Sequence, residues 1–247
     1  MVSVINNSKE FKELNERSWQ INANFIIEHG LPHVNIERLL SEEIGDLKKK
    51  NRYLNTLLDI GCGTGWLKNI IPNSLDYKGV DNCSRFISKL SKNDKCYSLF
   101  DVENEHPNSD IENLKSDILV CSLSLIETPF LEKAFKNLFH LASNGAYLII
   151  VGLNPFTELI KASKSHEELR KYLELYQSKE LRLLISKTIK SNGSTSDSAY
   201  HRILYSPNDY IQQAKENGFH LVDFKDGNNK NDIISQTVYQ YFLFKKS

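Results

Sequence analysis

Three glycines follow an apolar run in the stretch LLDIGCGTGWL, which covers residues 57–67. Gly61, Gly63 and Gly65 let the backbone turn sharply after a buried strand and let a ligand lie directly against it. The next helix would then point its N-terminal N–H groups at the bound group. Asp81 follows 20 residues after Gly61, where its carboxylate can accept hydrogen bonds from both hydroxyls of a ribose. This pattern predicts a site for an adenosine-bearing cofactor.

The residue at position 66 distinguishes between two kinds of adenosine cofactor. A dinucleotide fingerprint, G-x-G-x-x-G, needs a glycine there so that helix and strand pack closely around a pyrophosphate. This chain has Trp66 instead, which weighs against a nicotinamide oxidoreductase. The sequence D-I-G-C-G-T-G resembles the first motif of the class I S-adenosylmethionine-dependent methyltransferases. In that family the loop cups the methionyl end and the ribose of the cofactor.

Three further stretches resemble the next motifs of the same family, in the expected order: YKGVDNCS, LFDVEN and DILVCSLSLIE. The resemblance covers roughly residues 50–155 and 205–246. It implies S-adenosyl-L-methionine as the cofactor, with S-adenosyl-L-homocysteine as the product. The implied contacts are Asp81 on the ribose hydroxyls, Asn82 beside the adenine, Asp101 on the adenine amino group, the backbone of Val102 on the ring, and Ser122 and Leu123 near the reacting sulfur.

Two residues of the glycine loop have less certain roles. Asp59 either contacts the amino group of the cofactor or serves as a hydrogen-bond partner for the loop backbone. Cys62 is expected to contribute its backbone only. With these two, the predicted cofactor site consists of Asp59, Gly61, Cys62, Gly63, Gly65, Asp81, Asn82, Asp101, Val102, Ser122 and Leu123.

Five residues outside the predicted set of cofactor contacts are candidates for contact with a methyl acceptor. Glu127, just beyond the fourth strand, is either a catalytic group or a carboxylate that faces a helix N-terminus. His201 is a general base, a substrate contact or a partly buried structural histidine. Trp19 stacks on the adenine, closes the pocket or belongs to the core side of an amphipathic helix. Tyr200 and Arg202 are further candidates for substrate contact.

The elements that position these residues alternate between strand and helix from residue 54 onward. Alternating elements with nearly continuous apolar strands indicate a parallel sheet with helices on both faces, an α/β fold. The resemblance implies a Rossmann-like, doubly wound sheet of seven strands, mostly parallel with the last strand antiparallel. Residues 1–50 read as an N-terminal helical cap before a methyltransferase domain at 51–247. Residues 155–203 are predicted to form a helical lid inserted after the fifth strand.

Two helix starts can be predicted from their capping residues. Thr128, followed by Pro129, predicts a helix that begins there. Ser206 with Asp209 three residues later forms a capping box, with Gly218 as terminator.

Composition excludes several classes of function. Lys+Arg and Asp+Glu both number 31, so the net charge is +0. The chain therefore lacks the excess of positive charge that is typical of proteins that bind nucleic acid. The four cysteines form no C-x-x-C pair, which predicts reduced thiols, no metal site and a cytoplasmic protein. No apolar run is long enough to predict a membrane span. We expect a monomer or a homodimer.

These features favour methyl transfer to a small molecule, at oxygen, nitrogen or carbon, by in-line displacement. Enzymes that methylate the amino groups of nucleobases have an Asn/Asp-Pro-Pro-aromatic tetrad after the fourth strand, where this chain has Ser122-Leu123-Ser124-Leu125. The cytosine carbon-5 enzymes need a Pro-Cys nucleophile, and no cysteine here follows a proline. A peptide or protein acceptor and a non-catalytic module that binds the cofactor remain as alternatives.

Overall fold

A seven-stranded sheet forms the centre of the computed structural model, which describes residues 2–3, 7–29, 34–92, 94–105, 108–177, 183–189, 195–226 and 239–247. The strand order is β4-β3-β2-β5-β6-β10-β9. The strands, in the order of the sheet, are β4 (Tyr97–Leu99), β3 (Asp76–Asp81), β2 (Thr56–Ile60), β5 (Ser116–Ser122), β6 (Ala142–Leu153), β10 (Tyr239–Lys246) and β9 (Phe219–Asp226).

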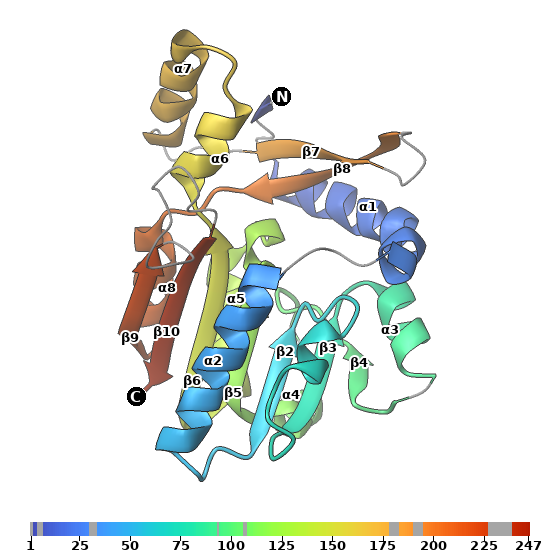
Figure 1. Ribbon diagram of the computed structural model, residues 1–247, viewed down its shortest axis with the longest axis vertical. Helices are drawn as coiled ribbons and strands as arrows, with labels where there is room; N and C mark the ends of the chain where they lie inside the picture. Colours follow the sequence, from blue (N-terminus) through green and yellow to red (C-terminus); the bar gives the residue numbers. More distant parts are fainter. Residues whose placement is uncertain are drawn as a thin grey trace.

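The first five of these strands are parallel to one another, and β10 runs in the opposite direction. It pairs antiparallel with β6 on one side and with β9 on the other. The parallel strands therefore end together at the upper edge of the sheet in Figure 1. This confirms the predicted doubly wound sheet with its last strand antiparallel.

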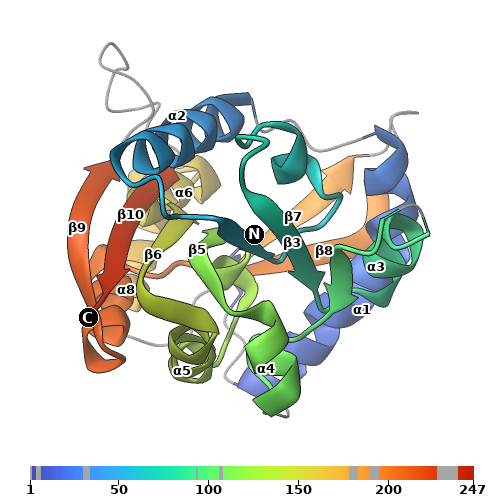
Figure 2. The same cartoon turned by 90° about the horizontal axis from the view of Figure 1, so that it is seen from below.

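Helices cover both faces of the sheet because neighbouring strand residues point to opposite sides. On one face, Leu57 packs with residues of α2 (Val34–Lys50), the 3-10 helix η1 (Trp66–Asn69) and α3 (Ser84–Leu90). On the other, Leu58 packs with α5 (Leu131–Leu141) and α8 (Pro207–Glu216). Figure 2 shows α2 on one side of the sheet and α5, α8 and α4 (Asn108–Leu114) on the other.

The packing of α2 differs from its predicted place in an N-terminal cap. Ile36, Leu40 and Ile44 of this helix are buried against the sheet. Of the two helices described in the predicted cap, α1 (Ser8–His29) is the one that lies apart from the sheet, across the end where the parallel strands finish (Figure 1). The part of the cap placed over the strand ends is thus α1.

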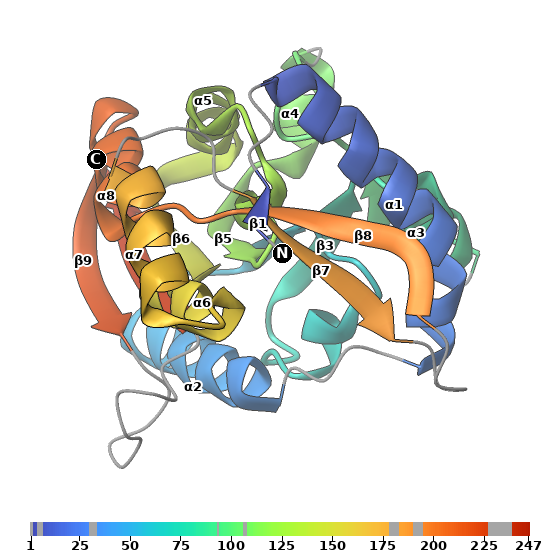
Figure 3. The same ribbon diagram turned by 90° about the horizontal axis from the view of Figure 1, so that it is seen from above.

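The segment predicted as a helical insert is only half helical. Helices α6 (Pro155–Ala162) and α7 (His166–Gln177) agree with the prediction, but β7 (Leu183–Ile189) and β8 (Thr195–Ile203) form an antiparallel hairpin. The two-residue strand β1 (Val2–Ser3) adds to β7 and makes a small three-stranded sheet. Figure 3 shows this hairpin beside α1 above the strand ends. The helical prediction for 183–189 is wrong because strand pairing with β8 and β1 determines the structure there.

The two predicted helix starts have different outcomes. Ser206 and Asp209 form the expected capping box, and Gly218 adopts a positive φ of 78° at the other end of α8. Helix α5 instead begins at Leu131, and Thr128 does not cap it. The carboxylate of Glu103 accepts the N–H of Phe130 at 2.7 Å, so a distant side chain takes the place of a local cap.

Candidate active site

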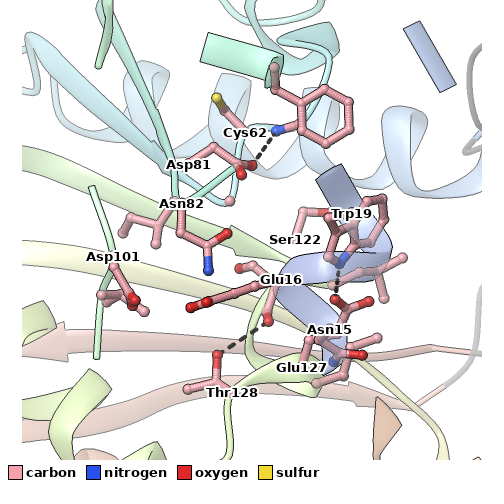
Figure 4. Close-up of a pocket in the computed structure, with 18 of the residues that line it drawn as sticks. Asn15, Glu16, Trp19, Cys62, Asp81, Asn82, Asp101, Ser122, Glu127 and Thr128 are labelled. Atoms are coloured by element: carbon pink, nitrogen blue, oxygen red, sulfur yellow. Dashed lines mark hydrogen bonds between the residues drawn. The ribbon is translucent and has the colours of Figure 1, made fainter. Parts of the chain in front are cut away.

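A cavity of about 220 Å³ lies between α1 and the carboxyl ends of β2, β3, β4 and β5. Its walls come from the glycine loop, from the residues that follow each strand end, and from α1 and β8 (Figure 4). Of the predicted cofactor residues, those that line it are Gly61, Cys62, Gly63, Asp81, Asn82, Asp101, Val102, Ser122 and Leu123. Four sequence motifs thus meet at one cavity.

Asp81 links the end of β3 to the glycine loop. Its side chain is largely buried, and it accepts the N–H of Gly63 at 2.9 Å and the N–H of Cys83 at 2.8 Å. Burial raises the pKa of Asp81, while these two hydrogen bonds oppose the rise because they stabilise the carboxylate. The carboxylate therefore holds the loop in shape and also faces the cavity.

Two glycines of the loop are needed for different reasons. Gly65 has a φ of 74°, and a Cβ there would lie 2.5 Å from the hydroxyl oxygen of Tyr97, so close packing excludes a side chain. Gly63 has a φ of 52°, and a Cβ there would meet no protein atom within 4 Å. Gly65 therefore permits packing beneath the loop, whereas Gly63 keeps the cavity side of the loop open.

Asp101 is held by a lysine of α1 that the sequence analysis did not identify. Lys12 Nζ lies 2.7 Å from Asp101 Oδ2 and 3.1 Å from Glu103 Oε2, with all three side chains largely buried. Asp101 also accepts the N–H of Glu103 at 2.9 Å. These contacts fix α1 to the loop after β4 and leave Asp101 facing the cavity.

Glu127 lies at the other side of the cavity, in the 3-10 helix η2 (Leu125–Glu127) that follows β5. The indole N–H of Trp19 donates a hydrogen bond to Glu127 Oε2, as Figure 4 shows. Burial raises the pKa of Glu127 to about 7; the Trp19 hydrogen bond and the charge of Arg202 oppose this rise, and Asp81 adds to it. Trp19 and Arg202, predicted to contact substrate, both line the cavity.

Four predicted residues have other positions. Asp59 and Gly65 lie beneath the loop, outside the cavity lining, and the Asp59 carboxylate accepts the hydroxyl of Tyr77 at 2.8 Å. His201, predicted as a general base, does not line the cavity, and its ring packs edge-on against Phe11 at 6.1 Å between centroids. The side chain of Tyr200 lies outside the described residues.

The backbone of His201 has a structural partner in α1. Asn15 Nδ2 donates to the carbonyl oxygen of His201 at 2.7 Å, and Asn15 Oδ1 accepts the N–H of His201 at 2.9 Å. This paired bond fastens α1 to β8 as a strand neighbour would. The two elements thus form one cover over the cavity.

Most of the contribution of α1 was not predicted from the sequence. Lys12, Asn15 and Glu16 line the cavity together with Trp19. Polar residues at positions 12, 15, 16 and 19 follow helical spacing, so they lie on one face of α1. That spacing was visible in the sequence, but only the contact with β4 and β5 shows which face of the helix covers the cavity.

A match to a known protein family shows to which class of proteins this sheet and its cavity belong. Residues 33–223 match the family described as a methyltransferase domain. The chain belongs to this family. The match covers β2 to β6 and all four motifs, which confirms the family resemblance predicted from the motifs. Among curated proteins, none matches this sequence significantly.

Solved structures with a similar fold are numerous, and three illustrate them. An S-adenosylmethionine-dependent methyltransferase from Clostridium acetobutylicum has a TM-score of 0.63 at 14% identity, with 94% of this chain and 98% of that chain covered. Magnesium protoporphyrin IX methyltransferase from Synechocystis, with bound SAH, has a TM-score of 0.56 at 14% identity and covers 98% and 100%. The amino pentose methyltransferase CalS10 from Micromonospora echinaspora, with bound SAM, has a TM-score of 0.56 at 10% identity and covers 92% and 96%.

These likenesses establish the fold, and the different acceptors in the two named reactions show that the fold does not fix the acceptor. Within the described residues, no helix has the length and apolar character needed to cross a membrane. The same part of the chain holds no group of three or more His, Cys, Asp or Glu arranged for a metal ion.

Proposed function

We propose that this protein transfers a methyl group from S-adenosyl-L-methionine to a small-molecule acceptor. The observation that carries the proposal is the single cavity shared by two sets of residues. One set consists of the predicted cofactor contacts, and the other, Trp19, Glu127 and Arg202, consists of the candidates for contact with the acceptor. A cofactor and an acceptor can therefore meet in the same cavity.

The residues present fit S-adenosyl-L-methionine. Asp81 has two backbone N–H partners, and each of its oxygens keeps a further lone pair for a ribose hydroxyl. Gly63 lines the cavity and leaves open space where a Cβ would stand. Asn82 and Asp101 line the cavity at the ends of the two neighbouring strands, as an adenine contact requires. When bound, the cofactor supplies a methyl group that is already activated on a sulfonium.

The chain's own residues then have three tasks. The glycine loop and Asp81 fix the position of the donor, because displacement needs the acceptor atom, the methyl carbon and the sulfur in line. Helix α1 covers the cavity and excludes water, and Lys12 and Asn15 hold it in place. Glu127 presents a carboxylate to the acceptor side, where a proton can be held.

The cover formed by α1 and β8 favours a small acceptor over a peptide or protein. Paired bonds between Asn15 and His201 join these elements above the cavity, so an extended chain would have to displace them. We further propose that α1 and the 155–203 segment act as a lid over the domain built on the sheet. The non-catalytic alternative remains, because it needs the same cofactor site.

Calorimetric titration with S-adenosyl-L-homocysteine tests the proposal. We expect the wild type to bind it and Asp81→Ala to bind more weakly by roughly 1–3 kcal/mol, the scale for buried polar partners left unpaired. Asp76→Ala is the matched control, since Asp76 begins the same strand at an exposed position. No binding by the wild type overturns the proposal.

A second measurement separates the alternatives. Isotopically labelled S-adenosyl-L-methionine is incubated with the protein and a cell extract, and the extract is then divided by size. Label in the small-molecule fraction supports the proposed acceptor class. Label in protein indicates a peptide or protein acceptor, and binding without transferred label indicates the non-catalytic module.

A further inference from the structure

The cavity holds more negative than positive groups, and most of the negative ones are compensated. The carboxylates of Asp101 and Glu103 both contact Lys12, and that of Asp81 accepts two backbone N–H groups. Arg202, the other cation of the lining, lies 3.9 Å from Glu158. The other carboxylates of the cavity have fewer cations or N–H donors beside them.

Glu127 has less compensation than Asp81, Asp101 and Glu103. Its Oε2 accepts the neutral indole N–H of Trp19, and no described residue forms an ion pair with it or a hydrogen bond to Oε1. A carboxylate taken out of water needs a cation or further donors, because its desolvation is otherwise uncompensated. In the described part of the protein, the Glu127 carboxylate therefore lacks an ion-paired cation or a second donor on the side of the cavity proposed for the acceptor.

The position of Glu127 makes it an acceptor contact. It follows Ser122 and Leu123 by a few residues, at the end of β5, and the motif resemblance assigns those two to the region of the reacting sulfur. Figure 4 shows Glu127 and Trp19 pointing toward one another beside Ser122, across the cavity from Asp101. A group bound to Glu127 thus lies near the transferred methyl.

Given the proposed methyl transfer, we infer that the acceptor is an amine that binds as its ammonium to Glu127, which takes one proton before the nitrogen is methylated. An ammonium has no lone pair, so it cannot attack until that proton has left. The N–H bond breaks and an O–H bond forms on Glu127. The free amine then forms the N–C bond to the methyl, and the S–C electron pair remains on sulfur. The product leaves as a methylated ammonium, and Glu127 returns its proton to water.

The environment of Glu127 suits this proton transfer. Burial disfavours charged forms of both partners, so the ammonium–carboxylate pair shifts toward neutral amine and carboxylic acid. The raised pKa of Glu127, about 7, agrees with this. A hydroxyl acceptor would supply no positive charge, and a carboxylate acceptor would place a second negative charge beside Glu127.

The chain contains two tryptophans, Trp19 and Trp66, and this makes a direct test possible. In a Trp66→Phe background, Trp19 is the sole indole, and its fluorescence reports the ionisation of the carboxylate to which it donates. The protein is saturated with S-adenosyl-L-homocysteine, which has no sulfonium charge, and titrated from acid to alkaline pH. The charged groups that act on Glu127 are Arg202 and Asp81, and both are unchanged in this background.

The probes are propylamine, propanol and propionate, which share one carbon frame and differ in charge. We expect propylamine to lower the titration midpoint of Trp19 fluorescence by about one pH unit or more, the effect of an opposite charge at close range. Propanol should leave the midpoint unchanged, and propionate should leave it or raise it. A midpoint that propylamine does not lower, or that propanol lowers equally, overturns the inference.

Two variants assign the signal to one carboxylate. Glu127→Gln keeps an acceptor for the Trp19 N–H and should abolish both the titration and the response to propylamine. Glu16→Gln makes the same change at another carboxylate of the cavity and should retain both. A response that survives Glu127→Gln contradicts the assignment. Failure to bind S-adenosyl-L-homocysteine refutes the proposed function, whereas normal binding without the amine response refutes this inference alone.

Discussion

Asp59, at the end of β2 beneath the glycine loop, allows a measurement of how burial changes the pKa of a carboxyl group and the stability of the fold. Its side chain is only 3% exposed, and among the described residues its hydrogen-bond partner is the hydroxyl of Tyr77. Burial raises the pKa of Asp59 from 3.8 to about 7; the Tyr77 hydrogen bond opposes the rise and the charge of Asp81 adds to it. In the folded protein Asp59 therefore carries a proton at mildly acidic pH.

The sign of the effect follows from where the proton is bound. Between about pH 4 and pH 7 the folded state holds a proton on Asp59 that the unfolded state has lost, so stability falls as pH rises. With about 1.36 kcal/mol per pKa unit, the loss is roughly 1.7 kcal/mol at pH 5 and roughly 4 kcal/mol at pH 8. Above the folded-state pKa the loss no longer grows.

Asp59→Asn removes this ionisation and keeps an oxygen for the Tyr77 hydroxyl. Relative to the wild type, we expect the variant to gain roughly 2.5 kcal/mol of unfolding free energy between pH 5 and pH 8. Urea denaturation without cofactor at several pH values measures it, and other titrating groups cancel in the difference. Asp76→Asn repeats the change at an exposed position of β3. A difference that stays constant with pH would show that Asp59 is not protonated in the folded protein.

Two further predictions concern the loop and the cover. Gly63→Ala should lose about 1 kcal/mol of stability from its positive φ yet bind S-adenosyl-L-homocysteine at least about tenfold more weakly, whereas Gly65→Ala should lose clearly more stability because its Cβ meets Tyr97. Calorimetry and urea unfolding measure both, and unchanged affinity in Gly63→Ala refutes the cavity role. Lys12→Met leaves Asp101 without its ion pair and should cost about 2–3 kcal/mol in the local stability of α1. Hydrogen exchange of the α1 amides should accelerate, and unchanged exchange would mean that other contacts hold the helix.

The cofactor half of the site could be predicted because it depends on local patterns. Each of Gly61, Asp81, Asp101 and Ser122 lies at or just beyond the end of its strand, and parallel strands bring such ends to one edge. Apolar runs mark the strands, so the positions follow from the sequence. The predicted loop contact of Asp59 was the exception, since its partner Tyr77 lies on the neighbouring strand.

The prediction failed where a partner outside the local segment determines the structure. Leu184, Ile185 and Ile189 have apolar spacing that suits a helix, but their segment pairs as a strand with β8, its hairpin neighbour, and with β1 near the start of the chain. Thr128 has the right type for a helix cap, yet Glu103 occupies that role for α5. In both cases a partner outside the segment supplies hydrogen bonds that local propensity cannot anticipate.

The acceptor half of the site depends almost wholly on such distant contacts. Trp19 reaches Glu127 across 108 residues, and Asn15 binds His201 across 186. Trp19 and Glu127 were each predicted from the sequence as separate candidates, and the structure shows that a hydrogen bond joins them at the cavity. Substitutions on this face of α1 change the cavity wall without touching a strand of the seven-stranded sheet. The cavity wall can therefore vary while the sheet and the glycine loop stay the same, which is why the motifs indicate the reaction class but not the acceptor.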